Sequence, residues 1–232
     1  MSVAVILLHG FTHTGRSWDP VIAAVGERYR PVAPDIRGHG TASDREPVTL
    51  DAVLEDLSGL VPGRFTLAGY SMGGRIALHL ALAMPERVER LVLIGASPGI
   101  ADPSARAARR AADERLADEI ERSTIEEFAR RWAGNPVLEG QPAWVHEERL
   151  RNTPAGLARA LRGLGIGALP SAWGRLGELT MPVALVVGER DQKFRKIADQ
   201  MAAVVSDAEV IVAPGAGHAV HLELPAAVAA LL

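Results

Sequence analysis

The chain contains no cysteine among its 232 residues. It therefore forms no disulfide, binds no metal through a thiolate and uses no thiol as a nucleophile. A net charge of −3 gives no electrostatic reason to expect a nucleic acid or an anionic membrane as partner. No apolar run approaches the length of a membrane span. Metal-binding histidine spacings, a P-loop and internal repeats are absent too, so we expect neither a cofactor nor a metal ion.

Apolar residues, in contrast, are plentiful. They make up 48% of the chain, enough for one domain with a large core. Met1 leads directly into an apolar run without a basic leader, so we expect a cytoplasmic protein.

The order of apolar and helical runs indicates an α/β fold with a mainly parallel sheet flanked by helices. Strands are expected at residues 3–8, 31–34, 65–68, 91–94, 181–188 and 210–212, and helices near 17–29, 50–60 and 74–84. Between them, helical stretches dominate at 103–123, 125–133, 143–152 and 155–163. We therefore expect a core built from residues 1–97 and 181–232, a helical cap inserted at 98–180, and an active site between the two.

The segment Gly69-Tyr70-Ser71-Met72-Gly73 lies between a predicted strand and a predicted helix. Gly-x-Ser-x-Gly in that context is typical of a nucleophile elbow, whose tight turn strains the serine backbone and exposes the hydroxyl. The start of the following helix directs N–H groups at developing negative charge. Ser71 is the predicted catalytic serine.

A catalytic serine needs a histidine and an acid, which follow it in this order along such chains: serine, acid, histidine. Asp191 lies just past the strand at 181–188, and Glu189 is its local competitor. His218 follows the strand at 210–212 on a glycine-rich loop, with His221 as its rival. We assign Asp191 and His218. The other histidines are expected to be packed or partly exposed in a helix (His79) or to lie in loops or at the surface (His13, His39, His146).

The loop His9-Gly10-Phe11 follows the first strand and predicts an oxyanion hole. Its donors are the N–H groups of Phe11 and of Met72, the residue after the serine. Loss of one such donor typically costs about 3 kcal/mol of transition-state stabilisation. Arg75, four residues after Ser71, is also expected beside the site. It either binds a substrate carboxylate or pairs with a core acid.

Five segments carry a resemblance that covers essentially the whole chain: GYSMGGR, SPGIADPSARAARRAADERLAD, RLRNTPAGLARALRGLGIGALPSAW, GERDQKF and GAGHAVHLELP. With them the chain resembles α/β-hydrolases, and more closely the 2-succinyl-6-hydroxy-2,4-cyclohexadiene-1-carboxylate synthases, the MenH family. The resemblance implies a lyase that removes a ring proton from a cyclohexene polycarboxylate and expels pyruvate. Ser71 would be the base, with the developing enolate held at Phe11 and Met72.

The resemblance also implies a small-molecule polycarboxylate as partner. Its expected binding residues are Tyr70, Arg75, Arg109, Trp132 and Arg151. Arg106 and Arg110 share a helix with Arg109, so only one or two of these three can point inward. Two other functions stay open: a serine hydrolase of esters or lactones that forms an acyl-serine, and a non-enzymatic small-molecule receptor on the same fold.

Overall fold

A computed structural model describes residues 3–27 and 29–232 of the chain. In this part of the chain, six parallel strands form one sheet in the order β2-β1-β3-β4-β5-β6. They are β1 (Val3–Leu8), β2 (Tyr29–Val32), β3 (Phe65–Tyr70), β4 (Val88–Ile94), β5 (Val183–Gly188) and β6 (Ala208–Ala213). The α/β fold with a parallel sheet flanked by helices, predicted from the sequence, is confirmed.

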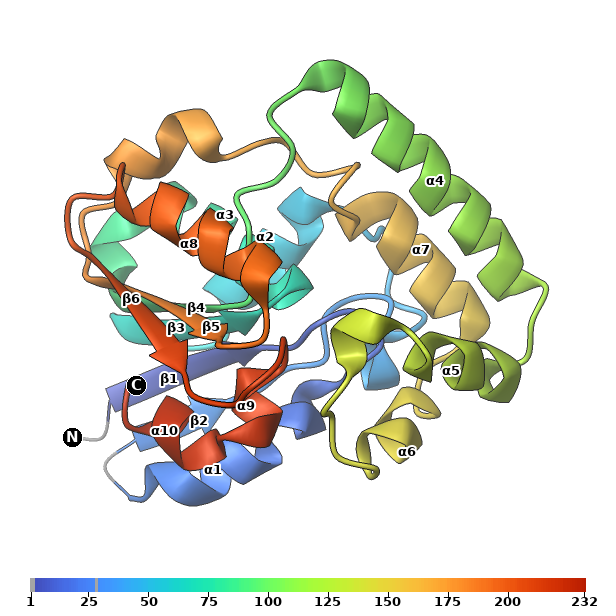
Figure 1. The fold of residues 1–232 in the computed structure, drawn as a ribbon, viewed down its shortest axis with the longest axis horizontal. Helices are drawn as coiled ribbons and strands as arrows, with labels where there is room; N and C mark the ends of the chain where they lie inside the picture. The colour runs from blue at the N-terminus through green and yellow to red at the C-terminus, as the bar shows by residue number, and fades with distance from the viewer. Residues whose placement is uncertain (1–2, 28) are drawn as a thin grey trace.

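Helices cover both faces of the sheet (Figure 1). One face packs against α1 (Asp19–Val25), α9 (Val220–Glu223) and α10 (Pro225–Ala229), and the other against α2 (Leu50–Ser58), α3 (Met72–Ala83) and α8 (Gln192–Ala202). Side chains along β1 alternate between the two faces. Val5 and Leu7 lie on the face covered by α1, α9 and α10, and Ile6 and Leu8 lie on the face covered by α2, α3 and α8. Because both faces of the sheet are covered, β1 and β5 are continuous apolar runs.

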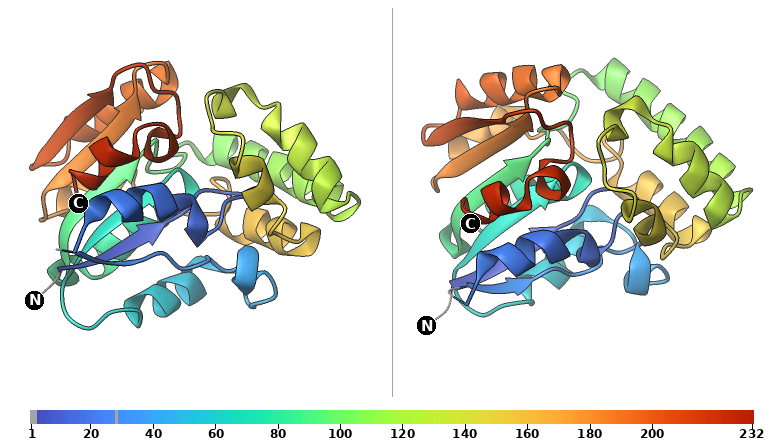
Figure 2. Two further views of the ribbon diagram at one scale, coloured as in Figure 1. Left: turned by 90° about the horizontal axis from the view of Figure 1, so that it is seen from below. Right: turned by 60° about the horizontal axis from the view of Figure 1, so that its bottom comes forward.

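Residues 95–182, all described, contain no strand. Their helices are α4 (Pro103–Glu121), α5 (Ile125–Ala133), α6 (Val145–Arg149) and α7 (Pro154–Leu164). They lie together at one end of the sheet (Figures 1 and 2), and we call residues 98–180 the cap. Three of these helices begin at side-chain caps, from Asp102, Thr124 and Thr153. The limits 98 and 180 stay a prediction.

Several element boundaries differ from the prediction. The helix expected at 17–29 is a short 3-10 turn followed by α1, which ends where Gly26 adopts a φ of +74°. The helix expected at 143–152 is reduced to α6. The 3-10 segments are η1 (Gly15–Trp18), η2 (Gly40–Ala42), η3 (Pro85–Arg87), η4 (Pro136–Leu138) and η5 (Trp173–Glu178). Among the described residues, no helix is both long and apolar enough to cross a membrane.

Candidate active site

Ser71 occupies a strained turn between β3 and α3, with φ +52° and ψ −107°. Glycines permit this turn. A Cβ on Gly69 would lie 2.4 Å from the Gly73 carbonyl oxygen, and one on Gly73 would lie 2.3 Å from the Leu8 carbonyl oxygen. The Ser71 N–H donates to the Ile94 carbonyl at 2.9 Å, which ties the turn to β4. Any larger residue at these glycines would therefore displace the serine.

The structure brings Ser71, His218 and Asp191 into one row. His218 Nε2 lies 3.3 Å from Ser71 Oγ, and His218 Nδ1 lies 2.6 Å from Asp191 Oδ2. The other oxygen of Asp191 accepts the Phe194 N–H at 3.3 Å and so caps α8. The carboxylate is thus fixed by the helix that it starts. The contact between Ser71 Oγ and His218 Nε2 is the longer of the two.

Gly95, at the end of β4, makes room for the histidine. It adopts a φ of +53°, and a Cβ there would lie 2.7 Å from His218 Cε1. The His218 ring also packs against the rings of Phe194 and Tyr70, at centroid distances of 4.5 and 5.2 Å. Sequence reasoning missed Gly95, although a glycine directly after an apolar strand was a usable signal.

The two competitors are engaged elsewhere. The Glu189 carboxylate accepts the Gly215 N–H at 2.8 Å and holds the loop that carries His218. His221 is fully buried, with its ring 4.3 Å from that of Tyr70 and 4.8 Å from that of Trp18. Burial lowers the pKa of His221 to about 3. Neither side chain is arranged to act on Ser71.

A cavity of about 350 Å³ opens between the cap and the carboxyl ends of the strands. Most of the predicted site residues line it: Phe11, Ser71, Met72, Arg75, Arg109, Trp132 and His218. Met72 is the first residue of α3, where N–H groups have no partner inside the helix. The Phe11 ring packs against the ring of Trp132, a cap residue, at a centroid distance of 5.5 Å. The cavity can thus hold a substrate against both the serine and the expected oxyanion donors.

Arg75 has no salt bridge within the described part of the chain, and its Nε atom is buried without a partner. Burial, and then the nearby charge of Arg109, lowers the pKa of Arg75 to about 10, so it remains charged at neutral pH. Asp113, the acid that could neutralise it, instead pairs with Arg109 at 2.7 Å. Of Arg106, Arg109 and Arg110, Arg109 is the one that lines the cavity.

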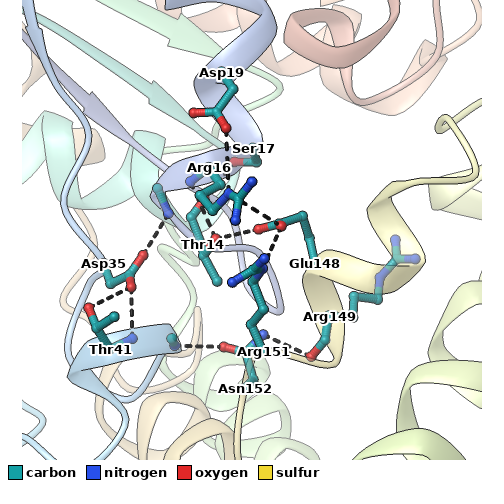
Figure 3. A network of polar contacts seen from close by, with 12 residues as sticks. Thr14, Arg16, Ser17, Asp19, Asp35, Thr41, Glu148, Arg149, Arg151 and Asn152 are labelled. Carbon is teal, nitrogen blue, oxygen red and sulfur yellow. Dashed lines mark hydrogen bonds and ion pairs between the residues drawn. The ribbon is translucent and has the colours of Figure 1, made fainter.

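The structure does not bring Tyr70 and Arg151 to this cavity. Tyr70 is buried beneath the site, among the rings of His13, His218 and His221. Arg151 lines a separate hollow of about 580 Å³ beside Asp35, and its Nε lies 2.7 Å from Glu148 Oε1 (Figure 3). That ion pair holds Arg151, which follows α6, in this hollow rather than in the cavity beside Ser71.

The cavity also has lining residues that sequence reasoning missed. Two of them, Lys193 and Phe194, lie two and three residues after Asp191 in the chain. Their position in the GERDQKF segment was the available signal. Others come from the cap and carry no local signal: Leu116, Asn135, Val137, Leu161, Gly165 and Ile166.

His13 and His39 lie in loops, as predicted, but they are buried there rather than at the surface, with 1% and 0% of their surface exposed. They lie near buried His9 and His221, and the ring centroids of His9 and His39 are 4.9 Å apart. Burial lowers the pKa of each of these four histidines. The Ile36 N–H donates to His9 Nε2 at 2.9 Å, so that nitrogen carries no proton.

The remaining histidines lie on helices. His79 is partly buried in α3, as predicted, and His146 is partly buried in α6 rather than in a loop. Across residues 3–27 and 29–232, no cluster of three or more histidine or acidic side chains is arranged to hold a metal ion.

Residues 5–231 match the alpha/beta hydrolase family. The chain therefore belongs to the α/β-hydrolase family. A provisionally named 2-succinyl-6-hydroxy-2,4-cyclohexadiene-1-carboxylate synthase of Bacillus subtilis is 34% identical, over 97% of this chain and 86% of its own. The structure of MenH from S. aureus is 29% identical with a TM-score of 0.92, covering 98% of this chain and 91% of the other. The resemblance to the MenH family inferred from the sequence is confirmed.

The chain is also similar to an esterase. The pimeloyl-[acyl-carrier protein] methyl ester esterase of Nitrosomonas europaea is 29% identical to this chain, over 95% of it and 90% of its own length.

Proposed function

We propose that the protein is a 2-succinyl-6-hydroxy-2,4-cyclohexadiene-1-carboxylate synthase of menaquinone biosynthesis, a carbon–oxygen lyase. The observation that carries the proposal is the charge of the cavity beside Ser71. Arg75 lines it without an ion-pair partner in the described chain, and Arg109, which is paired with Asp113, lines it too. A polycarboxylate satisfies such cations, because a guanidinium binds a carboxylate through two parallel hydrogen bonds. A neutral ester does not.

In this reaction, Ser71 Oγ takes the ring proton next to the succinyl carbonyl and passes its own proton to His218 Nε2. Asp191 holds the Nδ1–H tautomer of His218 and stabilises the imidazolium that forms. The N–H groups of Phe11 and Met72 stabilise the enolate oxygen. As the ring double bond shifts, the carbon–oxygen bond to the enolpyruvyl group breaks and the enolate of pyruvate leaves. It takes up a proton to become pyruvate, and loss of the proton from His218 restores the neutral base. No acyl-enzyme forms, so the triad acts as a base rather than as a nucleophile.

The second candidate is a serine hydrolase of carboxylic esters or lactones, which the esterase relative favours. The same three side chains would then form an acyl-serine that water cleaves. The two functions differ in the role of Arg75 and Arg109. The lyase uses them to bind substrate carboxylates, whereas hydrolysis of an uncharged ester uses neither.

Two parallel assays on the purified protein test the proposal. One follows pyruvate release and diene absorbance from the enolpyruvyl-succinyl-cyclohexene acid, and the other follows cleavage of short-chain aryl esters. We expect rapid pyruvate release with negligible ester cleavage. We expect Ser71→Ala to lower pyruvate release by several orders of magnitude while the protein stays folded, as removal of a triad member typically does. Ester turnover without pyruvate release would favour the hydrolase instead.

A cytoplasmic location, and the lack of nucleic-acid or membrane partners, stay predictions from the sequence.

A further inference from the structure

The cavity contains a third cation that neither the triad nor the arginine pair accounts for. Lys193 lies in the first turn of α8, two residues after Asp191, and lines the same cavity as Ser71. Its Nζ atom lies 5.4 Å from the centroid of the Phe194 ring, and that ring is 4.5 Å from the ring of His218. Attraction between the ammonium and the ring therefore favours a position close to the base.

No acid neutralises this charge. Lys193 has no salt bridge among the described residues, and no aspartate or glutamate lines the cavity. The nearest carboxylate in the sequence, Asp191, is occupied by His218 and by the Phe194 N–H. Lys193 is an exposed residue at the edge of the cavity, and an ammonium without an acidic partner there attracts an anionic ligand.

Lys193 lies apart from the arginine pair. Arg75 follows β3, whereas Lys193 follows β5, and β4 runs between these two strands. Neighbouring strands are about 4.8 Å apart, so the two helix starts are separated by roughly 10 Å. His218 sits over Gly95 at the end of β4, between them. The His218 ring thus lies between the starts of the two helices that carry Arg75 and Lys193.

We propose that Lys193 forms a second carboxylate subsite, which binds a different carboxylate of the substrate from the one held by Arg75 and Arg109. This inference rests on the proposed function and deepens it. With carboxylates bound on both sides, the carbon between them is held against Ser71 and His218. The cavity therefore selects polycarboxylates whose charges lie on either side of the reacting carbon. A monocarboxylate can occupy only one subsite at a time and is not oriented.

The test compares Lys193→Met with two controls. Lys193→Arg keeps the positive charge, and Lys196→Met removes the charge of the chain's other lysine, which lies on the same helix and does not line the cavity. For pyruvate release, we expect Lys193→Met to raise KM about 10- to 100-fold, the range expected for a lost charge-assisted hydrogen bond, with a smaller effect on kcat. Lys193→Arg should recover most of the affinity, and Lys196→Met should match wild type.

Two results would overturn the subsite. In the first, Lys193→Met and Lys196→Met behave alike. In the second, Lys193→Met shifts the pH profile of kcat/KM and slows aryl-ester cleavage as much as pyruvate release. That result would make Lys193 a positioning residue that acts through His218.

A binding measurement separates this inference from the proposed function. Calorimetry with tricarballylate, a flexible aliphatic tricarboxylate, requires no turnover. If wild type releases no pyruvate but binds tricarballylate about tenfold more tightly than Lys193→Met, the subsite stands and the lyase proposal falls. If wild type releases pyruvate and Lys193→Met is unimpaired in both assays, the subsite falls alone. If wild type neither binds tricarballylate nor releases pyruvate, both fall.

Discussion

At the scale of single residues, glycines decide where the reactive side chains lie. Gly73 lets the turn at Ser71 approach the carbonyls of Leu8 and His9, and Gly95 lets the His218 ring lie against the end of β4. Neither glycine touches a substrate. Each acts by occupying almost no space where another residue would collide with backbone or with the histidine.

Gly95→Ala should therefore impair catalysis by displacing His218. The new Cβ would lie 2.7 Å from His218 Cε1, closer than van der Waals contact allows. We expect kcat for pyruvate release to fall about 100-fold, in keeping with the sensitivity of catalysis to a displacement of about 1 Å. Gly63→Ala is the matched control, because Gly63 also has a positive φ of +74° and open space around it. Similar kinetics for the two variants would contradict this role of Gly95.

Arg75→Ala should weaken pyruvate release far more than cleavage of a neutral aryl ester. Loss of one charge-assisted contact to a carboxylate is expected to lower kcat/KM about 10- to 100-fold. Arg110→Ala is a suitable control, since Arg110 is an exposed arginine of the cap that does not line the cavity. Steady-state kinetics on both substrates decide the matter. An equal loss on the two substrates would mean that Arg75 supports the structure rather than the substrate.

At the scale of elements, α6 is tied to the core by buried polar contacts (Figure 3). The Thr14 hydroxyl donates to Glu148 Oε2 at 2.6 Å, and the other oxygen of Glu148 pairs with Arg151 at 2.7 Å. Asn152 accepts the Gly40 N–H at 3.0 Å and donates to the Thr12 carbonyl at 2.9 Å. These bonds join the cap to the loops after β1 and β2. They set where the cap rests over Ser71.

Glu148→Gln should destabilise the protein by about 1–3 kcal/mol. The amide would present an N–H₂ group to either Thr14 or Arg151, which leaves the buried Thr14 hydroxyl or the half-exposed Arg151 guanidinium without its acceptor. Urea denaturation measures the change in the free energy of unfolding. Glu147→Gln, on the same helix but exposed, should change it by less than about 0.5 kcal/mol. Equal stability of the two variants would show that these contacts do not hold α6 in place.

At the scale of the whole molecule, buried neutral histidines link stability to pH. Burial lowers the pKa of His9 and His13, and lowers the pKa of His39 and of His221 to about 3. In the unfolded chain the pKa of each of these histidines is about 6.5. Between pH 6.5 and the lower pKa values of the folded state, the unfolded state therefore binds more protons than the folded state. The contribution of these neutral histidines to the free energy of unfolding is therefore complete above pH 6.5, and it is lost as the pH falls below that value.

Urea denaturation between pH 7.5 and 5 should accordingly show a falling free energy of unfolding. Each fully neutral histidine contributes up to about 1.4 kcal/mol per pH unit below pH 6.5. Because both ring nitrogens of His221 are buried without partners, His221→Leu should remove one such contribution and flatten the profile by up to that amount. A wild-type profile that is flat over this range would refute the explanation.

The sequence by itself determined the parallel core and the order of the reactive side chains along it. Each strand is a local apolar run, and parallel strands end at the same edge, so Ser71, Asp191 and His218 could be expected to meet there. The glycines around Ser71 gave the turn a local signature. These features depend on residues close together in the chain.

Only the tertiary structure decided which cap residues face the cavity and which histidines are buried. Thr14 and Glu148 are 134 positions apart, and their hydrogen bond helps to place Arg151 in a hollow away from Ser71. Lys193, in contrast, lines the same cavity as Ser71. His13 and His39 are enclosed because distant segments pack over the loops that carry them. Such outcomes depend on contacts between remote segments, for which a local sequence pattern carries no signal.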